Sequence, residues 1–390
     1  MRKILFVTNR NIINTCGELR LIKNRAEVLY KKYHITTDFF VYTHKKIIKP
    51  ETINAGGKIK VYSYSNTNII QKQAMSYRIK KDIQDKILKK EYQFIILSGA
   101  AILSFIEVIR AIDENILVFA DSHGAFEELI EFPGKNVGAT IARHIYYKQV
   151  KKFEKQYLPK FDYIMAVSEE LKRYLIKEYG LCGDRINVIP CAIERFDLDF
   201  EKTKLSRKRA REKYGIKDDE QVFVYSGGTS KWQCIEESVK IFRSLCAKNS
   251  MQNCKLLLLS GNLAGITKYE GEDIIVDSLS GEEVFEILPA GDFAFLLRDD
   301  YITNKVAYPN KFLEYISAGL KIITTPYVED IARTVKKYNL GYVLSQMQYE
   351  SKLAVYCKSQ YGLFGDDFTV RQKLINDVSF ENRMAFFTEL

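Results

Sequence analysis

Short apolar runs alternate with longer amphipathic stretches along most of this 390-residue chain. A run of four to six apolar residues between polar turns is typical of a strand that is buried on both faces. The stretches between the runs have the spacing of helices that cover a sheet with one face. The alternation predicts an α/β fold made of doubly wound, Rossmann-like parallel sheets with helices on both sides.

The first half of the chain contains one complete set of such elements. Ser168 is placed to cap the helix that follows it, because its hydroxyl can accept a hydrogen bond from a free backbone amide. The predicted strands are Lys3–Asn9, Phe39–Thr43, Lys60–Ser65, Phe94–Ser98, Leu117–Ala120 and Tyr163–Val167, and the predicted helices are Glu18–Lys32, Gln71–Lys90, Ala101–Ile112, Gly138–Tyr157 and Glu169–Tyr179.

The pattern restarts in the second half, after the segment Asn187 to Pro190 and a charged stretch, 201–220, which predicts a solvated connector and helix. Ser280 and Glu283 form a capping box before another helix. A chain of this length is too long for one ordinary core, so we expect domains at residues 1–195 and 196–376, facing each other across a ligand-binding cleft. The second set of strands is Val222–Tyr225, Leu256–Leu259, Ile274–Val276, Phe293–Leu297 and Ile322–Thr324.

The charge and cysteine content narrow the class of protein. The formal net charge is +10, which attracts phosphates, acidic lipids or nucleic acid, but the lysines are spread along the whole chain, as in any Lys-rich proteome. No nucleic-acid-binding module is recognisable, so nucleic acid is not an expected partner. Seven cysteines without disulfide or zinc spacing, and an N-terminus without a signal peptide, predict a cytoplasmic protein. Weak peripheral association with an anionic membrane surface stays open.

A glycine-rich loop follows the first strand of the second half. It has the sequence YSGGTSKW at residues 225–232. Gly227 and Gly228 could expose backbone amides just past a strand, and Lys231 could neutralise a phosphate. The spacing is neither that of a P-loop nor that of a dinucleotide-binding fingerprint, so a diphosphate site and a plain turn are both open.

A second polar loop, from Arg298 to Gly319, carries the largest cluster of candidate residues. It begins at the end of an apolar strand, and a helix starts near Asn310 and ends at Gly319. A helix N-terminus is a favourable place for an anion, and a carboxylate one turn further in could bind two ribose hydroxyls. A purely structural role does not explain the clustering of the candidate donor-binding residues Arg298, Asn304, Pro309, Asn310, Lys311 and Glu314.

Two places in the first half are candidates as well. The loop from Asn9 to Gly17 follows the first strand, and Gly17 could let backbone approach a ligand, although a plain turn between strand and helix is the favoured explanation. His123 is one of only four histidines and lies beside a glycine at a strand end. Asp121 and Glu127 could orient its imidazole or contact a substrate.

These segments resemble the retaining, family-four glycosyltransferases of the GT-B fold, a group used in bacterial polysaccharide assembly. The resemblance covers most of the chain and is strongest from Val222 to Pro326. YPNKFLEYISAGLKIITTP, at residues 308–326, resembles the family's donor-site signature, and YSGGTSKW resembles its phosphate loop. FADSHGAFEEL, at 119–129, resembles the acceptor side of the cleft, and VIPCAIERF, at 188–196, the segment between the domains.

The resemblance implies how the chain would be divided and what it would do. The second domain would hold a nucleotide sugar, with UDP-sugars expected, and residues 377–390 would form a helix that crosses back to the first domain. A hexosyl group would pass to a glycan or polysaccharide-precursor acceptor, without metal or other cofactor. Lys231 and Lys311 would stabilise the departing diphosphate, and His123 would lie near the reacting sugar, with Gly17, Asp121 and Glu127 on the acceptor side.

The chain departs from the family's pattern at two points. Glu314 matches the second of two glutamates that are separated by seven residues, but Val306 stands at the first position, where Asn304 or Asp300 could substitute. The phosphate loop also lacks the family's usual arginine. A catalytically silent scaffold or sensor, and a sugar-nucleotide epimerase of the same fold, therefore remain as alternatives.

A D-x-D sequence, Asp197-Leu198-Asp199, imitates the metal site of another class of glycosyltransferases. It follows the segment between the two domains and lacks the surroundings of such a site. We therefore expect no metal there.

Overall fold

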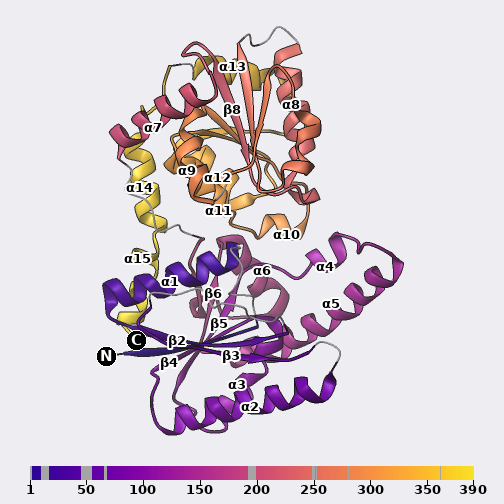
Figure 1. Cartoon of the computed structure of the whole chain (residues 1–390). Helices are drawn as coiled ribbons and strands as arrows, with labels where there is room; N and C mark the ends of the chain where they lie inside the picture. The colour runs from indigo at the N-terminus through magenta and orange to yellow at the C-terminus, as the bar shows by residue number, and fades with distance from the viewer. Residues whose placement is uncertain are drawn as a thin grey trace. The chain divides into compact units, whose positions relative to one another are not determined.

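A computed structural model describes residues 2–9, 17–44, 55–65, 68–191, 199–247, 251, 253–279, 281–360 and 362–390. The chain divides into two compact units, one made of Met1–Glu194 with Val378–Leu390 and the other of Arg195–Asp377. Each unit contains one parallel sheet with helices on its faces (Figure 1). The predicted α/β class with two Rossmann-like sheets is confirmed. No helix in the described part of the chain is both long and apolar enough to cross a membrane.

The first unit is built on a seven-stranded parallel sheet in the order β3-β2-β1-β4-β5-β6-β7. The order reverses between β1 and β4, and at such a switch point the loops after neighbouring strands diverge to opposite faces and leave room for a ligand. The strands are β1 (Lys3–Thr8), β2 (Thr36–Thr43), β3 (Ile59–Ser63), β4 (Phe94–Ser98), β5 (Leu117–Ser122), β6 (Tyr163–Ala166) and β7 (Ile186–Val188).

One helix of the first unit begins at its predicted cap. Ser168 Oγ accepts a hydrogen bond of 2.8 Å from the amide of Leu171, as expected of a cap. The α-helices are α1 (Gly17–Tyr33), α2 (Ile69–Leu88), α3 (Phe105–Arg110), α4 (Glu128–Glu131), α5 (Val137–Tyr157), α6 (Glu169–Tyr179) and α15 (Phe380–Arg383), and short 3₁₀ turns lie at η1 (Ala100–Ile102), η2 (Leu158–Lys160), η3 (Gly183–Arg185) and η8 (Ala385–Thr388).

The second unit has a six-stranded parallel sheet in the order β10-β9-β8-β11-β12-β13, with its switch point between β8 and β11. Its strands are β8 (Gln221–Ser226), β9 (Cys254–Leu259), β10 (Ile274–Asp277), β11 (Phe293–Leu296), β12 (Lys321–Thr324) and β13 (Gly341–Val343). Its α-helices are α7 (Phe200–Lys213), α8 (Ile235–Ala247), α9 (Gly281–Ile287), α10 (Ile302–Lys305), α11 (Asn310–Ser317), α12 (Glu329–Tyr338), α13 (Ser351–Ser359) and α14 (Phe368–Val378), and its 3₁₀ turns are η4 (Lys231–Gln233), η5 (Leu263–Gly265), η6 (Thr267–Tyr269) and η7 (Leu288–Ala290).

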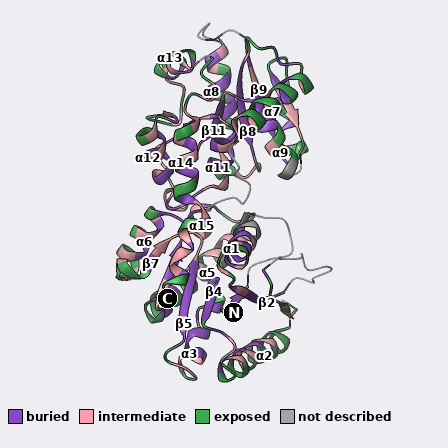
Figure 2. Cartoon of the chain, turned by 90° about the vertical axis from the view of Figure 1, so that its left-hand side faces the viewer, coloured by how far each residue is buried: buried purple, intermediate pink, exposed green. Residues whose placement is uncertain are grey.

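Both cores lie between the sheets and their helices, and the central strands are buried along their whole length (Figure 2). In the second unit the rings of Phe293 and Phe295 stack on Phe223 with centroids 5.0 and 5.7 Å away. In the first unit Phe387, from the end of the chain, packs 4.9 Å from Phe119 and is fully buried. The last residues of the chain therefore complete the first core.

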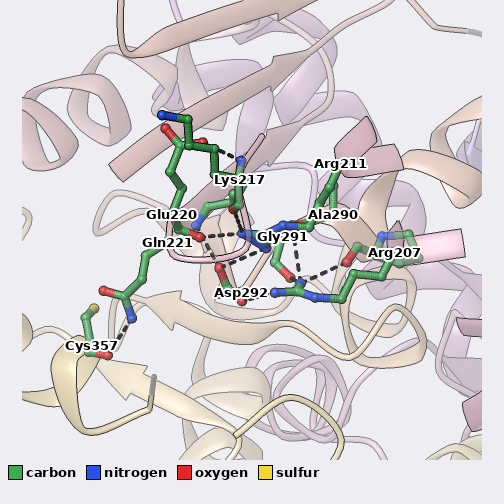
Figure 3. Close-up of polar contacts among 11 residues, drawn as sticks. Arg207, Arg211, Lys217, Glu220, Gln221, Ala290, Gly291, Asp292 and Cys357 are labelled. Atoms are coloured by element: carbon green, nitrogen blue, oxygen red, sulfur yellow. Dashed lines mark hydrogen bonds and ion pairs between the residues drawn. The ribbon is translucent and has the colours of Figure 1, made fainter. Parts of the chain in front are cut away.

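The charged stretch 201–220 is more than a solvated connector, and that prediction was wrong in part. The guanidinium of Arg207 donates to the carbonyls of Pro289, Ala290 and Gly291 and forms an ion pair of 2.5 Å with Asp292 (Figure 3). Arg211 is buried and also donates to the Ala290 carbonyl, at 3.2 Å. These arginines fasten α7 to the turn before β11, because a guanidinium can satisfy several carbonyls at once.

Three other predicted elements need correction. Ala101–Ile112 is not one helix: it divides into η1 and α3 around Ser104. The end of the chain is not one helix either, because α15 and η8 replace it after Ser379 caps α15. The predicted strand Leu117–Ala120 continues to Ser122, which places Asp121 inside β5. Ser280, the proposed partner of Glu283 in a capping box, lies outside the described residues.

Candidate functional site

Gly227 follows β8 and lies directly beneath the side chain of Lys311. Its φ of +148° is one that residues with a side chain rarely adopt, and an added Cβ would lie 1.4 Å from Lys311 Nζ. The Gly227 amide donates to the Leu259 carbonyl at 2.8 Å, so the prediction that this amide is exposed for a phosphate was wrong. The carbonyl of Gly228 accepts a hydrogen bond of 2.6 Å from the Tyr225 hydroxyl. The glycine-rich loop makes room for a cation.

Two cations meet beside this loop. Lys311 Nζ donates to Gln233 Oε1 at 2.8 Å, and the guanidinium of Arg298 approaches the same oxygen at 3.4 Å. Lys311 also lies 5.3 Å from the centre of the Tyr225 ring, a cation–π contact. Within the described ranges, neither cation forms an ion pair with a carboxylate. Gln233, which the sequence analysis missed, is thus the shared neutral partner.

The electrostatics of this cation pair are unfavourable in the free protein. Burial and the neighbouring Arg298 lower the pKa of Lys311 to about 7, although Glu314 acts in the opposite direction. Burial also lowers the pKa of Arg298, whose side chain is held by its own chain through a 2.7 Å hydrogen bond to the Leu297 carbonyl. A bound anion would relieve both effects, because it would supply the missing opposite charge.

The helix that carries Lys311 starts and ends where the sequence predicts. Pro309 is the N-cap of α11, Asn310 is its first residue, and Gly319, with φ of +84°, follows its end. The first amides of a helix have no partner within it, so the N-terminus of α11 presents donors and positive charge beside Lys311. Glu314 lies in the same helix and is buried.

The proposed replacements for the missing first glutamate are engaged elsewhere. The side-chain amide of Asn304 is buried and donates to the Asp299 carbonyl at 2.9 Å. Asp300 is exposed and forms an ion pair of 2.6 Å with Lys305. Val306 is buried. These contacts stabilise the conformation of the loop. They leave no observation that supports sugar binding by Asn304 or Asp300.

Lys231 does not join Lys311 and Arg298 in the structure. It is exposed at the start of η4. Gln233, two residues further on, is the residue that contacts Lys311 and Arg298. The sequence predicts the charged Lys231 as the phosphate-binding residue of this loop. In the structure the neutral Gln233 is the residue that contacts both cations.

In the first unit, His123 belongs to a buried, charge-compensated group. Its Nε2 lies 2.5 Å from Asp121 Oδ2, and the other oxygen of Asp121 accepts from Arg25 at 2.8 Å. Arg25, on α1, also donates to the Ile189 carbonyl at 2.7 Å and faces the Phe380 ring. The neighbouring His123 and Arg25 keep the pKa of Asp121 well below its usual range, despite its burial. The sequence analysis missed Arg25.

The second ring nitrogen of His123, Nδ1, is available for a hydrogen bond outside this group. His123 Nδ1 is buried and has no hydrogen-bond partner in the described structure. A recess of about 20 Å³, room for about one water-sized group, is lined by Asp121, His123 and Glu154, among others. Burial raises the pKa of Glu154 to about 7. The recess therefore combines a histidine with a carboxyl group whose pKa lies near neutral.

Glu127 does not orient His123, so that alternative was wrong, while a contact of Glu127 with an acceptor stays a prediction. Its carboxylate accepts from the Tyr174 hydroxyl at 2.5 Å and forms an ion pair of 3.2 Å with Lys151. Lys151 also forms an ion pair with Glu178, at 2.9 Å. These contacts tie α5 and α6 together, because each element contributes charged side chains to the same cluster.

The remaining sequence candidates give little support for a site. Gly17 is the first residue of α1, but residues 10–16 of the proposed loop lie outside the described residues. The same holds for Asp197. Asp199 is the N-cap of α7 and accepts a hydrogen bond from the Lys202 amide at 3.1 Å. The described part of the chain contains no cluster of three or more His, Cys, Asp or Glu residues that could hold a metal ion.

A protein-family comparison adds a classification to this geometry. Residues 71–195 match the family model described as Glycosyltransferase Family 4. This segment of the chain is therefore similar to that family. The family-four segment covers β4, β5 and the His123 region, in the first half of the chain. It does not extend to Val222–Pro326, where the sequence resemblance was judged strongest. No curated protein matches the chain.

The solved structures show the GT-B fold over the whole length of the chain. A glycosyltransferase from Rickettsia africae has a TM-score of 0.72 at 14% identity, covering 100% of this chain and 97% of that one. The apo form of the lipopolysaccharide outer core galactosyltransferase WaaB has a TM-score of 0.64 at 12% identity, covering 100% of both chains. An E. coli structure described as trehalose-6-phosphate bound with UDP-2-fluoro glucose has a TM-score of 0.62 at 11% identity, covering 99% and 98%.

Proposed function

We propose that this protein transfers a hexosyl group from a UDP-sugar to a glycan or polysaccharide precursor, with retention of configuration and without a metal ion. The single observation that carries the proposal is the pair of cations, the half-buried Lys311 and the buried Arg298, which share the neutral Gln233 above Gly227. The diphosphate of a nucleotide sugar is an anion suited to such a pair. Support comes also from the family-four segment and from the structural relative bound with UDP-2-fluoro glucose.

The proposed roles follow from the chemistry of the side chains. Lys311, Arg298 and the first amides of α11 would hold the diphosphate and stabilise the charge that builds up as the bond between sugar and phosphate breaks. Glu314 would bind ribose hydroxyls. The acceptor hydroxyl would attack the same sugar carbon on the face that the phosphate leaves, and a phosphate oxygen would take the hydroxyl proton.

His123 would act on the acceptor side. Its free Nδ1 could hydrogen-bond a sugar hydroxyl, and Asp121 would hold the ring in place through Nε2. Gly17, Gly228, Asn310 and Lys231 remain proposed neighbours of the substrates. The protein would work in the cytoplasm, where nucleotide sugars are made.

The first experiment is a titration of the full-length chain with UDP, GDP and ADP, followed by the fluorescence of Trp232. This residue is the only tryptophan of the chain and lies next to Gln233. We expect saturable binding, with UDP preferred, that is strongly weakened in Lys311→Met and unchanged in His123→Ala. A UDP affinity that is equal in Lys311→Met and in the unmodified chain would refute the donor site.

A catalytically silent subunit of the same fold is the second candidate. It is favoured by Val306, which is buried at the position where the family has its first glutamate. Binding of a UDP-sugar without hydrolysis or transfer to any tested acceptor would support this candidate. Release of UDP from the UDP-sugar would support the transferase.

A further inference from the structure

The N-terminal turns of α5 present apolar side chains to solvent. Val137, Ile141 and Ile145 are 76%, 56% and 55% exposed, although most isoleucines of the chain are buried. Their spacing of four residues places them on one face of the helix. Together with α4, this part of α5 projects from the first unit (Figure 1). Three neighbouring apolar side chains on a projecting helix favour a binding surface over chance exposure.

The same face of α5 also carries basic side chains. His144 and Lys148 line a shallow hollow with Ile141 and Ile145. Lys152 follows one turn after Lys148, and both are exposed. In the described structure neither lysine forms an ion pair. We name Val137, Ile141, His144, Ile145, Lys148 and Lys152 the α5 face.

The opposite side of α5 is covered, which leaves the α5 face free for a partner. Arg143 points away from the face and donates to the carbonyls of Leu129 and Glu128, at 3.1 and 2.6 Å. These bonds hold α4 against the far side of α5. Further along, Val150 and Glu154 of α5 are buried in the unit. The helix is therefore fixed at its C-terminal part and exposed along one face near its start.

We propose that the α5 face docks on an anionic phospholipid bilayer. A helix that lies in the bilayer interface inserts its apolar side chains among the acyl chains and directs lysines to the lipid phosphates. Apolar side chains and unpaired cations on one face fit this arrangement. The formal net charge of +10 adds a general attraction to an anionic surface.

A second copy of this chain fits the α5 face less well. Packing of two such faces would place the lysines of both copies in one interface, and like charges repel. A stable dimer buries roughly 800 Å² of surface on each partner. The three exposed apolar side chains of the α5 face offer less surface than that. The inference does not depend on the proposed transferase activity, since it rests only on the surface of the first unit.

The test is sedimentation of the full-length chain with vesicles of phosphatidylcholine alone or with about one third phosphatidylglycerol. We expect binding to the anionic vesicles only, weakened by salt because part of the attraction is between exposed charges. The double variant Ile141→Glu/Ile145→Glu should bind at least roughly tenfold more weakly, since it removes two inserting side chains and adds repulsion.

A matched control separates the α5 face from overall charge. Ile70→Glu/Tyr77→Glu changes two exposed residues of α2, 80% and 70% exposed, and alters the net charge by the same amount. This variant should keep most of its vesicle binding. Equal loss in both double variants would overturn the proposal, as would equal binding of Ile141→Glu/Ile145→Glu and the unmodified chain.

Two further measurements keep the outcome unambiguous. UDP titrations through Trp232 should be the same in both double variants, which shows that the folded donor unit is intact and that failure here differs from failure of the proposed function. Gel filtration reports the oligomeric state. A dimer that Ile141→Glu/Ile145→Glu converts to a monomer, without any vesicle binding by the unmodified chain, would assign the α5 face to a second copy instead.

Discussion

In the first unit the buried guanidinium of Arg25 lies 2.8 Å from the carboxylate of Asp121, whose other oxygen holds His123. In the second unit the cations Arg298 and Lys311 meet only at the neutral Gln233. One buried group is compensated by its own chain, and the other lacks a negative partner at bonding distance among the described residues. Buried charge without compensation costs free energy. The contrast fits the proposal that the second group binds an anionic ligand, whereas the first group already contains its counter-charge.

The largest expected effect is on stability, from loss of the compensating carboxylate in the first unit. Asp121→Asn should lower the free energy of unfolding by about 3–5 kcal/mol, because Arg25 and His123 would keep their burial without a negative partner. Urea unfolding followed by circular dichroism measures this, and Trp232 fluorescence reports the second unit separately. Asp300→Asn, which breaks an exposed ion pair, should cost about 0–1 kcal/mol. If both variants lost a similar free energy of unfolding, the buried ion pair of the first unit would not be an important source of stability.

The second effect is on turnover. Lys311→Ala should lower kcat/KM for transfer on the order of a hundredfold, because a cation at the leaving group matters most in the transition state. Its stability should be unchanged or higher, since a repelled, buried charge is removed. Lys231→Ala, an exposed lysine of the neighbouring turn, is the control and should lose less activity. A folded, fully active Lys311→Ala protein would exclude this lysine from the site.

The third effect is a pH dependence of donor binding. The pKa of Lys311 is about 7 in the free protein, and a bound diphosphate raises it. Binding therefore takes up a proton above pH 7, and the affinity for a UDP-sugar should fall with rising pH, by at most about tenfold per unit. Lys311→Arg, which stays charged, should show a flat profile. Calorimetry between pH 6.5 and 8.5 measures both, and a flat profile for the unmodified chain would contradict the shifted pKa.

The smallest expected effect is that of metal removal. EDTA should leave transfer unchanged, because the proposed site uses lysine, arginine and helix amides for the diphosphate. Activity that is lost with EDTA and restored by manganese would show that a metal ion completes the charge in the second unit. The missing carboxylate partner of Lys311 and Arg298 would then no longer be evidence for a site that binds an anion without metal.

The α/β class and most elements could be predicted from the sequence, because strands buried on both faces leave continuous apolar runs. β4 was predicted to the residue, and the start of α11 at Asn310 follows from Pro309. The short edge strands β7 and β13 were missed, since three residues give no pattern. The end of the chain was mistaken for one helix, because its apolar spacing resembles that of a helix even though it folds as α15 and η8.

The sequence by itself determined which residue types are available to the site. It marked Lys311, Arg298, Gly227 and His123 because a charged or flexible residue next to a buried strand is unusual. Only the tertiary structure decided which of them meet. Gln233 and Arg25 carry no local signal, since a glutamine in a turn and an arginine on a helix are ordinary. Their importance arises when neighbouring parallel strands bring distant loops to one edge of a sheet, where burial makes each contact strong.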